Sequence, residues 1–455
     1  MDLLRSLATA LDRPTIPWKT LILTFAIGEY CLESFLSYRQ YEVLCRTAIP
    51  PQLSKEIDQA TFDKSQAYGR SKLKFGAVSG IWNQIKNYIT ITQDIYPKLW
   101  ALTGIWVTQY LPSRFQGEIT HSLIFAFTYS FAETLLGLPF SYYHHFVLEE
   151  KYGFNKQTLS LFFTDLVKGQ ALSLAFGIPL GAAFLKIIQK TGDQFFFYLW
   201  AFTLVVQLGA ITIYPILIVP LFNKLTPLEP GQLKDRVEAL AQRLKFPLGE
   251  LQVIDGSKRS AHSNAYFTGL PWKKKIVIYD TLIEKSEIKE VEAILAHELG
   301  HWSMGHTTKL LGISSFHLFY VFALFSVFIS NNSLYEAFGF YKEKPIIIGF
   351  ILFNEVLSPT DSLIKLGMNV LTRRFEYEAD AFSNRLGYSA ELASSLIKLQ
   401  VQNLSSMDAD YLYSSYHYSH PILTERLKAI GWKGDKKVST SSSANGTAKA
   451  TKDEL

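Results

Sequence analysis

The sequence predicts an all-α polytopic membrane protein with about seven transmembrane helices and a small β-hairpin or sheet on one side of the membrane. Composition is the first observation behind this prediction, because 48% of the 455 residues are hydrophobic and only 19% are charged. Soluble domains average about 25% charged residues. The second observation is a positive mean hydropathy of +0.10. The third is a series of seven apolar runs of nearly spanning length.

Each apolar run approaches the ~20 residues that a helix needs to cross the hydrocarbon core. The runs centre on Leu21–Leu36, Tyr96–Leu111, Leu123–Phe140, Ala171–Ile188, Phe195–Leu217, Leu310–Ile329 and Ile346–Leu366. The second run is the weakest, since it is short and contains Pro97 and Lys98. Residues 1–18 lack a short apolar core with a small-residue cleavage site, so the first run is expected to be an uncleaved anchor.

Carboxylates interrupt several of these runs, at Glu29, Glu33, Glu133, Glu355 and Asp361. An ionisable residue at membrane depth normally faces the bundle interior or a water-filled cavity. These carboxylates therefore indicate a wet interior. For Glu29 and Glu33, a position near the membrane interface explains the sequence equally well.

Positive charges are concentrated in two connecting segments, 38–94 and 141–168, and are sparse in the others. Cytoplasmic loops carry the excess of Lys and Arg, so these two segments are expected to be cytosolic. The N-terminus is then lumenal, and seven crossings bring the C-terminus to the cytosol. The net charge of +5 is mild and scattered, which gives no indication of a nucleic-acid partner. The two cysteines, Cys31 and Cys45, offer neither a disulfide framework nor a Cys-type zinc site.

A metal-binding motif lies in residues 290–306, EVEAILAHELGHWSMGH, which are good helix formers without proline. On such a helix His297 and His301 are four residues apart and share one face. Two imidazoles so placed can hold one Zn²⁺, with Glu298 beside the metal as general base. A catalytic zinc keeps one position for water and lowers the pKa of that water to ~7. The alternative is a solvated amphipathic helix with incidental histidines, and a third ligand decides between the two.

Two segments compete for the role of third ligand. Gly305 and His306 fall one position away from the spacing that the metzincin motif requires, so His306 is expected at the surface or behind a ligand. The other candidate segment is 373–385, RRFEYEADAFSNR, in which Glu376 and Asp380 are four residues apart on one helical face. Glu376 can complete a His₂Glu site, and Asp380 can fix the tautomer of a ligand imidazole. Taken singly, either acid is better explained by an ordinary charged helix.

Topology supports the pairing of these segments. Two predicted spans lie between His301 and Glu376, and two crossings return the chain to the side from which it started. Both halves of the site are therefore expected to meet at the cytosolic face, where they form a zincin-type metalloprotease site with one Zn²⁺ per chain.

The chain is expected to divide into five parts. Residues 223–308 combine a polar helical pattern with alternation typical of a small sheet, and residues 369–432 predict two or three helices. The expected parts are transmembrane helices 1–5 with cytosolic loops (1–222), a cytosolic catalytic segment (223–308), transmembrane helices 6–7 (309–368), C-terminal catalytic helices (369–432) and a disordered tail (433–455).

The sequence resembles the type I CAAX prenyl proteases, integral-membrane metallopeptidases of the endoplasmic reticulum membrane and, in animals, of the inner nuclear membrane. The resemblance covers most of the chain up to about Trp432. The segments that carry it read FVLEEKYGFNKQT (146–158), IYPILIVPLFNKLTPL (213–228), DGSKRSAHSNAYFTG (255–269), HELGHWSMGH (297–306), RRFEYEADAF (373–382) and YHYSHPILTERL (416–427). HELGH is common to many proteases, whereas the whole set is nearly specific to this family.

The resemblance implies a fold in which seven helices enclose a large chamber with the zinc at its cytosolic end. It assigns His297, His301 and Glu376 to the metal and Glu298 to the general base. Asp380 is implied to act behind the ligands or in proton handling. His420 and Arg426 resemble the transition-state group, His420 donating toward the oxyanion and Arg426 pairing with carboxylates near the zinc. Asn264, Ala265 and Tyr266 resemble the edge strand that binds the substrate backbone.

By this resemblance the lipid bilayer is the surrounding medium, and the substrates are prenylated CAAX proteins that lose their last three residues. If the host is a fungus, an upstream cut in a prenylated pheromone precursor is also implied. Two alternatives stay open: a membrane quality-control protease for misfolded or translocon-jammed proteins, and a catalytically idle protein that binds lipid or peptide. The C-terminal KDEL is read in the lumen but is expected in the cytosol, and a glycan on Asn445 would reverse that orientation.

Overall fold

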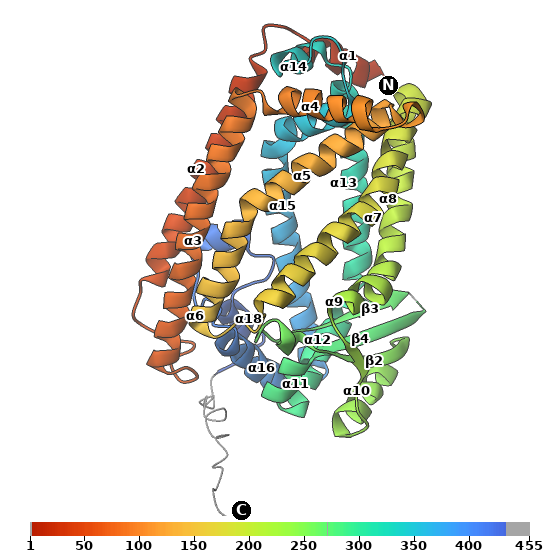
Figure 1. The fold of residues 1–455 in the computed structure, drawn as a ribbon. Helices are drawn as coiled ribbons and strands as arrows, with labels where there is room; N and C mark the ends of the chain where they lie inside the picture. Colours follow the sequence, from red (N-terminus) through yellow and green to blue (C-terminus); the bar gives the residue numbers. More distant parts are fainter. Residues whose placement is uncertain (1, 271, 434–455) are drawn as a thin grey trace, which may run out of the picture.

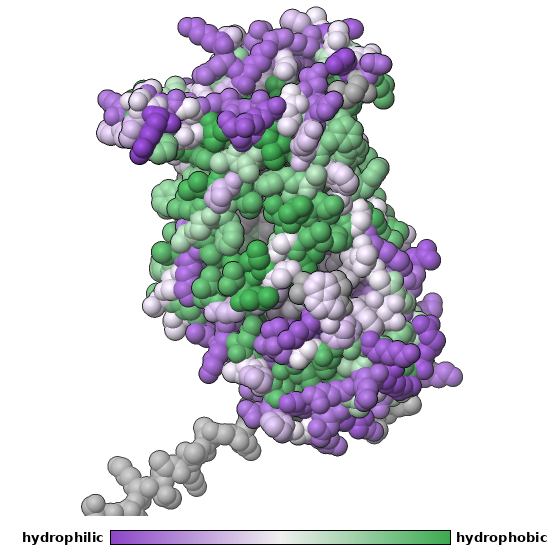
Figure 2. All heavy atoms as spheres, turned by 90° about the vertical axis from the view of Figure 1, so that its right-hand side faces the viewer, coloured by the Kyte–Doolittle hydropathy of each residue, from purple (hydrophilic) through white to green (hydrophobic). Residues whose placement is uncertain are grey.

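The computed structural model describes residues 2–270 and 272–433, which form a long helical bundle capped at one end by a small sheet and short helices (Figure 1). Five helical stretches in this part of the chain are apolar and long enough to cross a membrane, and one of them, Leu159–Phe222, contains two bundle helices. On the face drawn in Figure 2, an apolar band lies between two hydrophilic ends. The predicted polytopic, mainly helical fold is confirmed. Its seven long helices are α2 (Trp18–Leu44), α3 (Gln59–Thr92), α5 (Glu118–Tyr143), α7 (Leu159–Thr191), α8 (Phe195–Ile213), α13 (His306–Phe328) and α15 (Ile346–Arg385).

The second long helix of the bundle differs from the prediction. The predicted run forms α4 (Ile95–Tyr110), which lies across the end of the bundle, whereas α3 runs beside α2 (Figure 1). With 16 residues, α4 is about 24 Å long and too short for a hydrocarbon core of ~30 Å. The 34 residues of α3 include polar side chains that lowered its hydropathy, and one of them, Lys86, pairs with Glu133 of α5 at 2.5 Å. Because α3 takes the place of the predicted second span, the order in which the chain crosses the membrane is unchanged.

Short elements extend and connect the long helices. They are α1 (Asp2–Leu11), η1 (Ser113–Phe115), η2 (His144–Glu149) and α6 (Glu150–Tyr152) after α5, η3 (Gly192–Gln194) between α7 and α8, η4 (Tyr214–Ile218) and α9 (Val219–Phe222) after α8, and α14 (Asn332–Ala337). Both η2 and η4 are π-helical, a geometry that is frequent near functional sites. Both occur where a bundle helix enters the cap.

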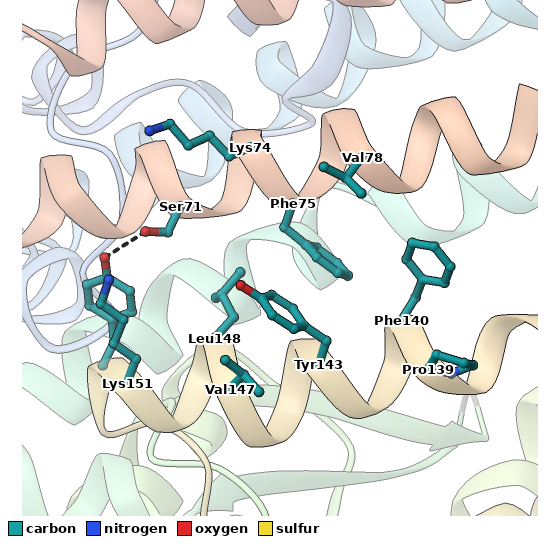
Figure 3. Close-up of a pocket in the computed structure, with 11 residues that line it drawn as sticks. Ser71, Lys74, Phe75, Val78, Pro139, Phe140, Tyr143, Val147, Leu148 and Lys151 are labelled. Atoms are coloured by element: carbon teal, nitrogen blue, oxygen red, sulfur yellow. Dashed lines mark hydrogen bonds between the residues drawn. The ribbon is translucent and has the colours of Figure 1, made fainter.

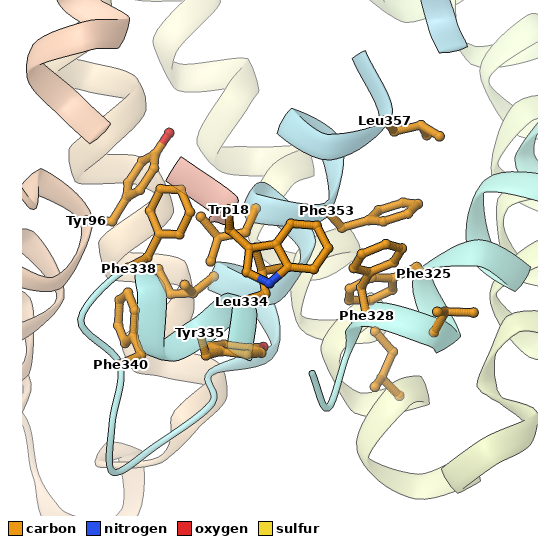
Figure 4. Packing of buried hydrophobic residues seen from close by; sticks show 14 of the residues in the cluster. Trp18, Tyr96, Phe325, Phe328, Leu334, Tyr335, Phe338, Phe340, Phe353 and Leu357 are labelled. Atoms are coloured by element: carbon orange, nitrogen blue, oxygen red, sulfur yellow. The ribbon is translucent and has the colours of Figure 1, made fainter. Parts of the chain in front are cut away.

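Buried aromatic side chains close the end of the bundle that lies far from the sheet (Figure 4). Trp18 meets Phe328 edge to face with 6.0 Å between ring centroids, an arrangement that aromatic pairs favour. The Trp18 indole N–H donates to Ser333 Oγ at 3.0 Å, and the Tyr335 hydroxyl donates to the Pro345 carbonyl at 2.9 Å. The indole N–H of Trp18 and the hydroxyl of Tyr335 therefore both have partners inside this core.

The middle of the bundle is packed much more loosely. In the most apolar stretches of α5 and of α7–α8, only 6% of residues are buried, whereas a helix on a filled core buries a stripe of roughly a quarter of its circumference. A pocket of about 530 Å³ also separates α3 from the end of α5, and Phe75 and Phe140 line it from opposite sides (Figure 3). This loose packing agrees with the chamber that the family resemblance implies.

The sheet lies in the cap and has four strands in the order β1-β2-β4-β3. The strands are β1 (Leu225–Pro227), β2 (Leu248–Ile254), β3 (Ala265–Leu270) and β4 (Lys273–Tyr279). Strand β4 pairs parallel with β2 and antiparallel with β3. The predicted hairpin is therefore β3–β4, and β3 is an edge of the sheet.

The remaining helices of the cap surround the far end of α15. They are α10 (Gln232–Arg243), η5 (Gly256–Lys258), α11 (Asp280–Lys285), α12 (Ile288–Ser303), α16 (Ser389–Gln402), α17 (Tyr411–His417) and α18 (Leu423–Ala429). Helix α15 has 40 residues, so it continues beyond the predicted span and carries Glu376 into the cap. Residues 434–455, with the KDEL ending and the Asn445 sequon, lie outside the described residues.

Candidate metal centre

Helix α12 holds the HELGH motif in a fixed position inside the cap. Its start is a capping box in which Glu287 and Glu290 each accept from the other's backbone N–H, an arrangement that satisfies two otherwise unpaired donors. Lys398 of α16 pairs with Glu290 at 2.7 Å. A Cβ at Gly300 would lie 3.1 Å from the ring of Phe382. Glycine at this position therefore allows α12 and α15 to approach closely.

The structure brings together the three predicted metal ligands. The Nε2 atoms of His297 and His301 are 3.2 Å apart, and the Glu376 carboxylate lies 3.4 Å from the first and 3.3 Å from the second. Donors about 2.1 Å from a tetrahedrally coordinated zinc ion lie about 3.4 Å from one another. Two imidazoles and one carboxylate at this spacing fit a catalytic zinc site, in which a fourth position stays open.

Asp380 lies behind His297. Its Oδ1 is 2.9 Å from His297 Nδ1, so the carboxylate accepts the Nδ1–H and leaves Nε2 free to bind the metal. The guanidinium of Arg426 donates to both oxygens of Asp380, at 2.8 and 2.6 Å, and lies 3.7 Å from Glu376. Arg426 therefore balances two buried carboxylates.

His301 is supported by His306, for which the sequence allowed either a surface position or a position behind a ligand. His306 is almost fully buried, with 1% of its surface exposed, and its Nδ1 lies 2.9 Å from His301 Nδ1. On its other side, His306 Nε2 is 3.0 Å from Glu378 Oε2, and the ring stacks on Phe375. His306 is therefore positioned behind a ligand and not at the surface.

Gly305 makes this contact possible. It has φ +66°, a left-handed conformation that glycine adopts readily, and it turns the chain between α12 and α13. The turn returns His306 toward His301. The sequence carried no clear signal for Glu378, which is separated from His306 by the whole of α13 and most of α15.

Glu298 follows His297 on α12, is half-buried, and interacts electrostatically with His297, His301 and Glu376. Burial raises the pKa of Glu298, and the neighbouring His297 and His301 oppose that rise. A carboxylate with a raised pKa is a stronger base than an ordinary glutamate. This environment suits the role that the motif predicts for it.

His420 is also close to the metal ligands. Its Nε2 lies 3.3 Å from Glu376 Oε1, and its Nδ1 lies 2.8 Å from Ser419 Oγ. The side chain stands in an open pocket, where nearby protein atoms displace water from the ring and lower its pKa, with Glu376 opposing. A neutral imidazole donates through one ring nitrogen and accepts through the other.

The predicted substrate-binding residues form the start of β3. Asn264 is exposed, and its carbonyl accepts from the Tyr279 N–H at 3.1 Å. Ala265 and Tyr266 pair with Ile278 and Val277 of β4. Because β3 is the edge of the sheet, its other side has no strand partner in the described chain and can accept an extended peptide.

Comparisons with known proteins agree with this architecture. Residues 40–224 match the model of the CAAX prenyl protease N-terminal region with five membrane helices, and residues 227–432 match peptidase family M48. The chain is 46% identical to CAAX prenyl protease 1 of Saccharomyces cerevisiae, over 95% of this chain and 99% of that one. It is 40% identical to the CAAX prenyl protease 1 homolog of Homo sapiens, over 90% and 94%.

The crystal structure of S. mikatae Ste24p superposes with a TM-score of 0.88 at 46% identity, covering 92% of this chain and 100% of that one. The chain therefore belongs to peptidase family M48, as an integral-membrane metallopeptidase of the CAAX prenyl protease type.

Proposed function

We propose that this protein is a zinc-dependent endopeptidase that removes the last three residues of farnesylated or geranylgeranylated CAAX proteins. The observation that carries the proposal is the convergence of His297, His301 and Glu376, whose ligand atoms all lie within 4.8 Å of one another. The names of the relatives supply the substrate class. We further propose that the active site faces the cytosol from the endoplasmic reticulum membrane, because basic residues predominate at the end of the bundle that carries the cap.

Zn²⁺, when held by the two histidines and Glu376, supplies Lewis acidity that polarises the scissile carbonyl and acidifies a water molecule. Glu298 accepts the proton that the attacking water loses and passes it to the departing amine nitrogen. Its raised pKa brings it closer to the value that is best for both steps. To accept the proton from water and then donate it to the leaving amine, the Glu298 carboxylate must reach both groups.

His420 stabilises the oxyanion that forms as the carbonyl is attacked. When the Ser419 hydroxyl donates to Nδ1, the proton of the neutral ring is on Nε2, the nitrogen that faces Glu376 and the site. An N–H aimed at developing charge contributes about 10²–10³ in rate. Arg426 and Asp380 keep Glu376 and His297 in place during this step.

Substrate binding on β3 uses backbone hydrogen bonds and therefore tolerates many sequences. Selection for prenylated substrates must then come from apolar surface, and the loosely packed middle of the bundle can supply it. Because β3 itself does not contact the prenyl chain in this scheme, it could also bind unprenylated membrane proteins, which is compatible with a second function in quality control.

The test is hydrolysis of a farnesylated CAAX peptide by the purified protein, with and without a chelator. We expect release of the tripeptide, its loss on chelation and its recovery with zinc. No release by zinc-loaded protein would contradict the proposal. Equal cleavage of the farnesylated and unprenylated peptides would instead favour the quality-control function.

A further inference from the structure

A polar pocket of about 330 Å³ opens beside His420. Three parts of the chain form it: α3, the end of α16 and the segment 417–423. Among its lining residues are Lys72, Gln400, Ser405, Ser406, Ser419 and His420. Apart from His420 and Ser419, which orients the His420 ring, none of them has a part in the hydrolysis described above. A pocket of this size lies at the small end of ligand-binding sites.

Lys72 supplies the positive charge of this pocket. Its Nζ lies 4.3 Å from the centre of the Tyr68 ring, a cation–π contact that orients the side chain. The Tyr68 hydroxyl donates to Glu149 Oε1 at 2.6 Å, which fixes the ring. The Glu149 carboxylate acts on the Lys72 ammonium through its charge, but among the described residues no carboxylate oxygen forms an ion pair with Lys72 Nζ within 4.0 Å. The ammonium is therefore held in position without a direct ion pair.

Such a charge on a bundle helix needs an explanation. A lysine within a spanning helix is unfavourable unless it is paired or near an interface, and it is a functional candidate for that reason. Lys86, further along the same helix, has the expected partner in Glu133. Lys74 has its Nζ 5.8 Å from the centre of the Tyr41 ring of α2 and lines the α3–α5 pocket (Figure 3). Lys72 alone among these three faces the pocket beside His420.

The pocket also lies at the beginning of β3. Asn403, which follows α16, accepts from the Ser263 N–H at 3.3 Å and contacts His262 Nδ1 at 3.1 Å. Tyr68 and Leu404 share an apolar cluster that Ala261 also contacts. The chain next to both walls of the pocket is thus tied to residues 261–263, which end just before Asn264 and the substrate strand.

Strand direction connects this position with the substrate. A peptide that pairs antiparallel with β3 has its C-terminal end at the beginning of β3 and therefore toward the pocket. Antiparallel pairs outnumber parallel ones about two- to three-fold. A peptide bound in the parallel sense would extend the other way and leave the pocket empty.

We propose that Lys72 binds the free C-terminal carboxylate of the substrate in this pocket. The proposal rests on the proposed function, in which the released fragment is a tripeptide with a free carboxylate at its end. Three extended residues span about 10 Å. A fixed cation that binds the terminal carboxylate in the pocket beside His420 would set how many residues lie between the cleaved bond and that carboxylate, and so the length of the released fragment.

The experiment compares two farnesylated CAAX peptides that differ only at the end, one with a free carboxylate and one with a carboxamide. We expect the wild-type protein to cleave the acid with a kcat/KM about 10-fold or more above that of the amide, the effect of one hydrogen bond to a charged group. Lys72→Met should lose that factor on the acid, mainly through KM, and show no loss on the amide. Lys72→Arg should keep most of the preference, and Lys74→Met, the control on the same helix, should keep all of it.

The amide substrate separates a binding role from a folding defect. Equal cleavage of the two peptides by the wild-type protein would overturn the proposal, and so would a Lys72→Met variant that loses activity on both peptides alike. If the zinc-loaded wild-type protein cleaves neither peptide, the proposed function itself fails, which is a distinguishable result.

Discussion

Arg426 binds Asp380 through two parallel hydrogen bonds, of 2.8 Å from Nε and 2.6 Å from Nη2. The first residue lies on α18 and the second on α15, so this pair fastens the last short helix of the cap to the helix that carries Glu376. The same carboxylate orients His297. The position of His297 in the metal site therefore depends on the packing of α18 through this one ion pair.

Replacement of Arg426 by lysine should damage the metal site more than it damages the fold. Lysine keeps the charge but cannot reproduce the paired hydrogen bonds. We expect a loss of about 10–100-fold in zinc affinity or kcat/KM, the usual effect of a residue that supports a ligand. The measurements are chelator competition and peptide hydrolysis.

Arg259 offers a matched control, because it makes the same paired contact with Asp165 at 2.8 and 3.0 Å outside the metal site. Arg259→Lys should leave zinc affinity unchanged. An equal loss in both variants would mean that the Arg426 effect is a general loss of packing.

Replacement of Glu378 by glutamine should weaken zinc binding without changing the ligands. Glu378 accepts from His306, and His306 contacts His301, so the change disturbs the tautomer of a ligand through one intermediate ring. We expect zinc affinity to fall by about 10-fold, measured by competition with a fluorescent chelator. Glu378 also pairs with exposed Arg374, so Arg374→Gln is the control. Unchanged affinity in Glu378→Gln would show that His306 acts only by packing.

Gly300→Ala should misalign the two helices that share the metal. Its Cβ would meet the Phe382 ring at 3.1 to 3.2 Å, and overpacking of this kind costs about 1–3 kcal/mol. We expect a lower Tm together with weaker zinc binding. Gly312→Ala is the matched control on α13, since nothing lies within 4 Å of its added Cβ. Similar effects of both substitutions would contradict the role given to this helix crossing.

The ion pair between Asp410 and Arg39 predicts a loss of stability in acid. The hydrogen bond from Arg39 holds the pKa of Asp410 below its ordinary value of 3.8. A lowered folded-state pKa stabilises the fold above the unfolded-state pKa, and this stabilisation disappears as pH falls through the folded-state value. Asp410→Asn keeps the cap of α17 but removes the charge.

At pH 7 this variant should therefore have a Tm lower by about 1–2 °C, and the difference should vanish as the pH falls through the folded-state pKa of Asp410, which lies below 3.8. The measurement is thermal unfolding as a function of pH. A difference in Tm that stays constant down to that pH would show that the charge of Asp410 contributes nothing to stability.

Much of the metal site was predictable, because helical spacing places His297 with His301 and Glu376 with Asp380 on single faces. The two pairs lie far apart in the chain, but an even number of predicted spans lies between them. This even number was enough to place both pairs on the same side of the membrane. His306 could not be assigned in the same way. Its contact with His301 depends on the left-handed turn at Gly305, and its partner Glu378 comes from a separate helix.

The fold was predicted less completely for a related reason. Hydropathy identifies helices that face lipid on most sides, and α3 does not satisfy that condition because polar residues such as Lys86 face partners within the bundle. The run that forms α4 is apolar because it packs on the closed end, where Tyr96 and Trp100 are buried. An apolar sequence indicates that a helix is buried, but it does not distinguish burial in protein from burial in lipid.

The central claim is that one metal is shared by α12 and α15. Its most direct test is the zinc content of purified wild-type protein, Glu298→Gln and Glu376→Ala, each measured together with its hydrolysis of the farnesylated peptide. We predict one zinc per chain in the wild type, one zinc with a rate lower by about 10²–10⁴ in Glu298→Gln, and loss of both zinc and activity in Glu376→Ala. Full zinc content in Glu376→Ala, or full activity in Glu298→Gln, would contradict the account.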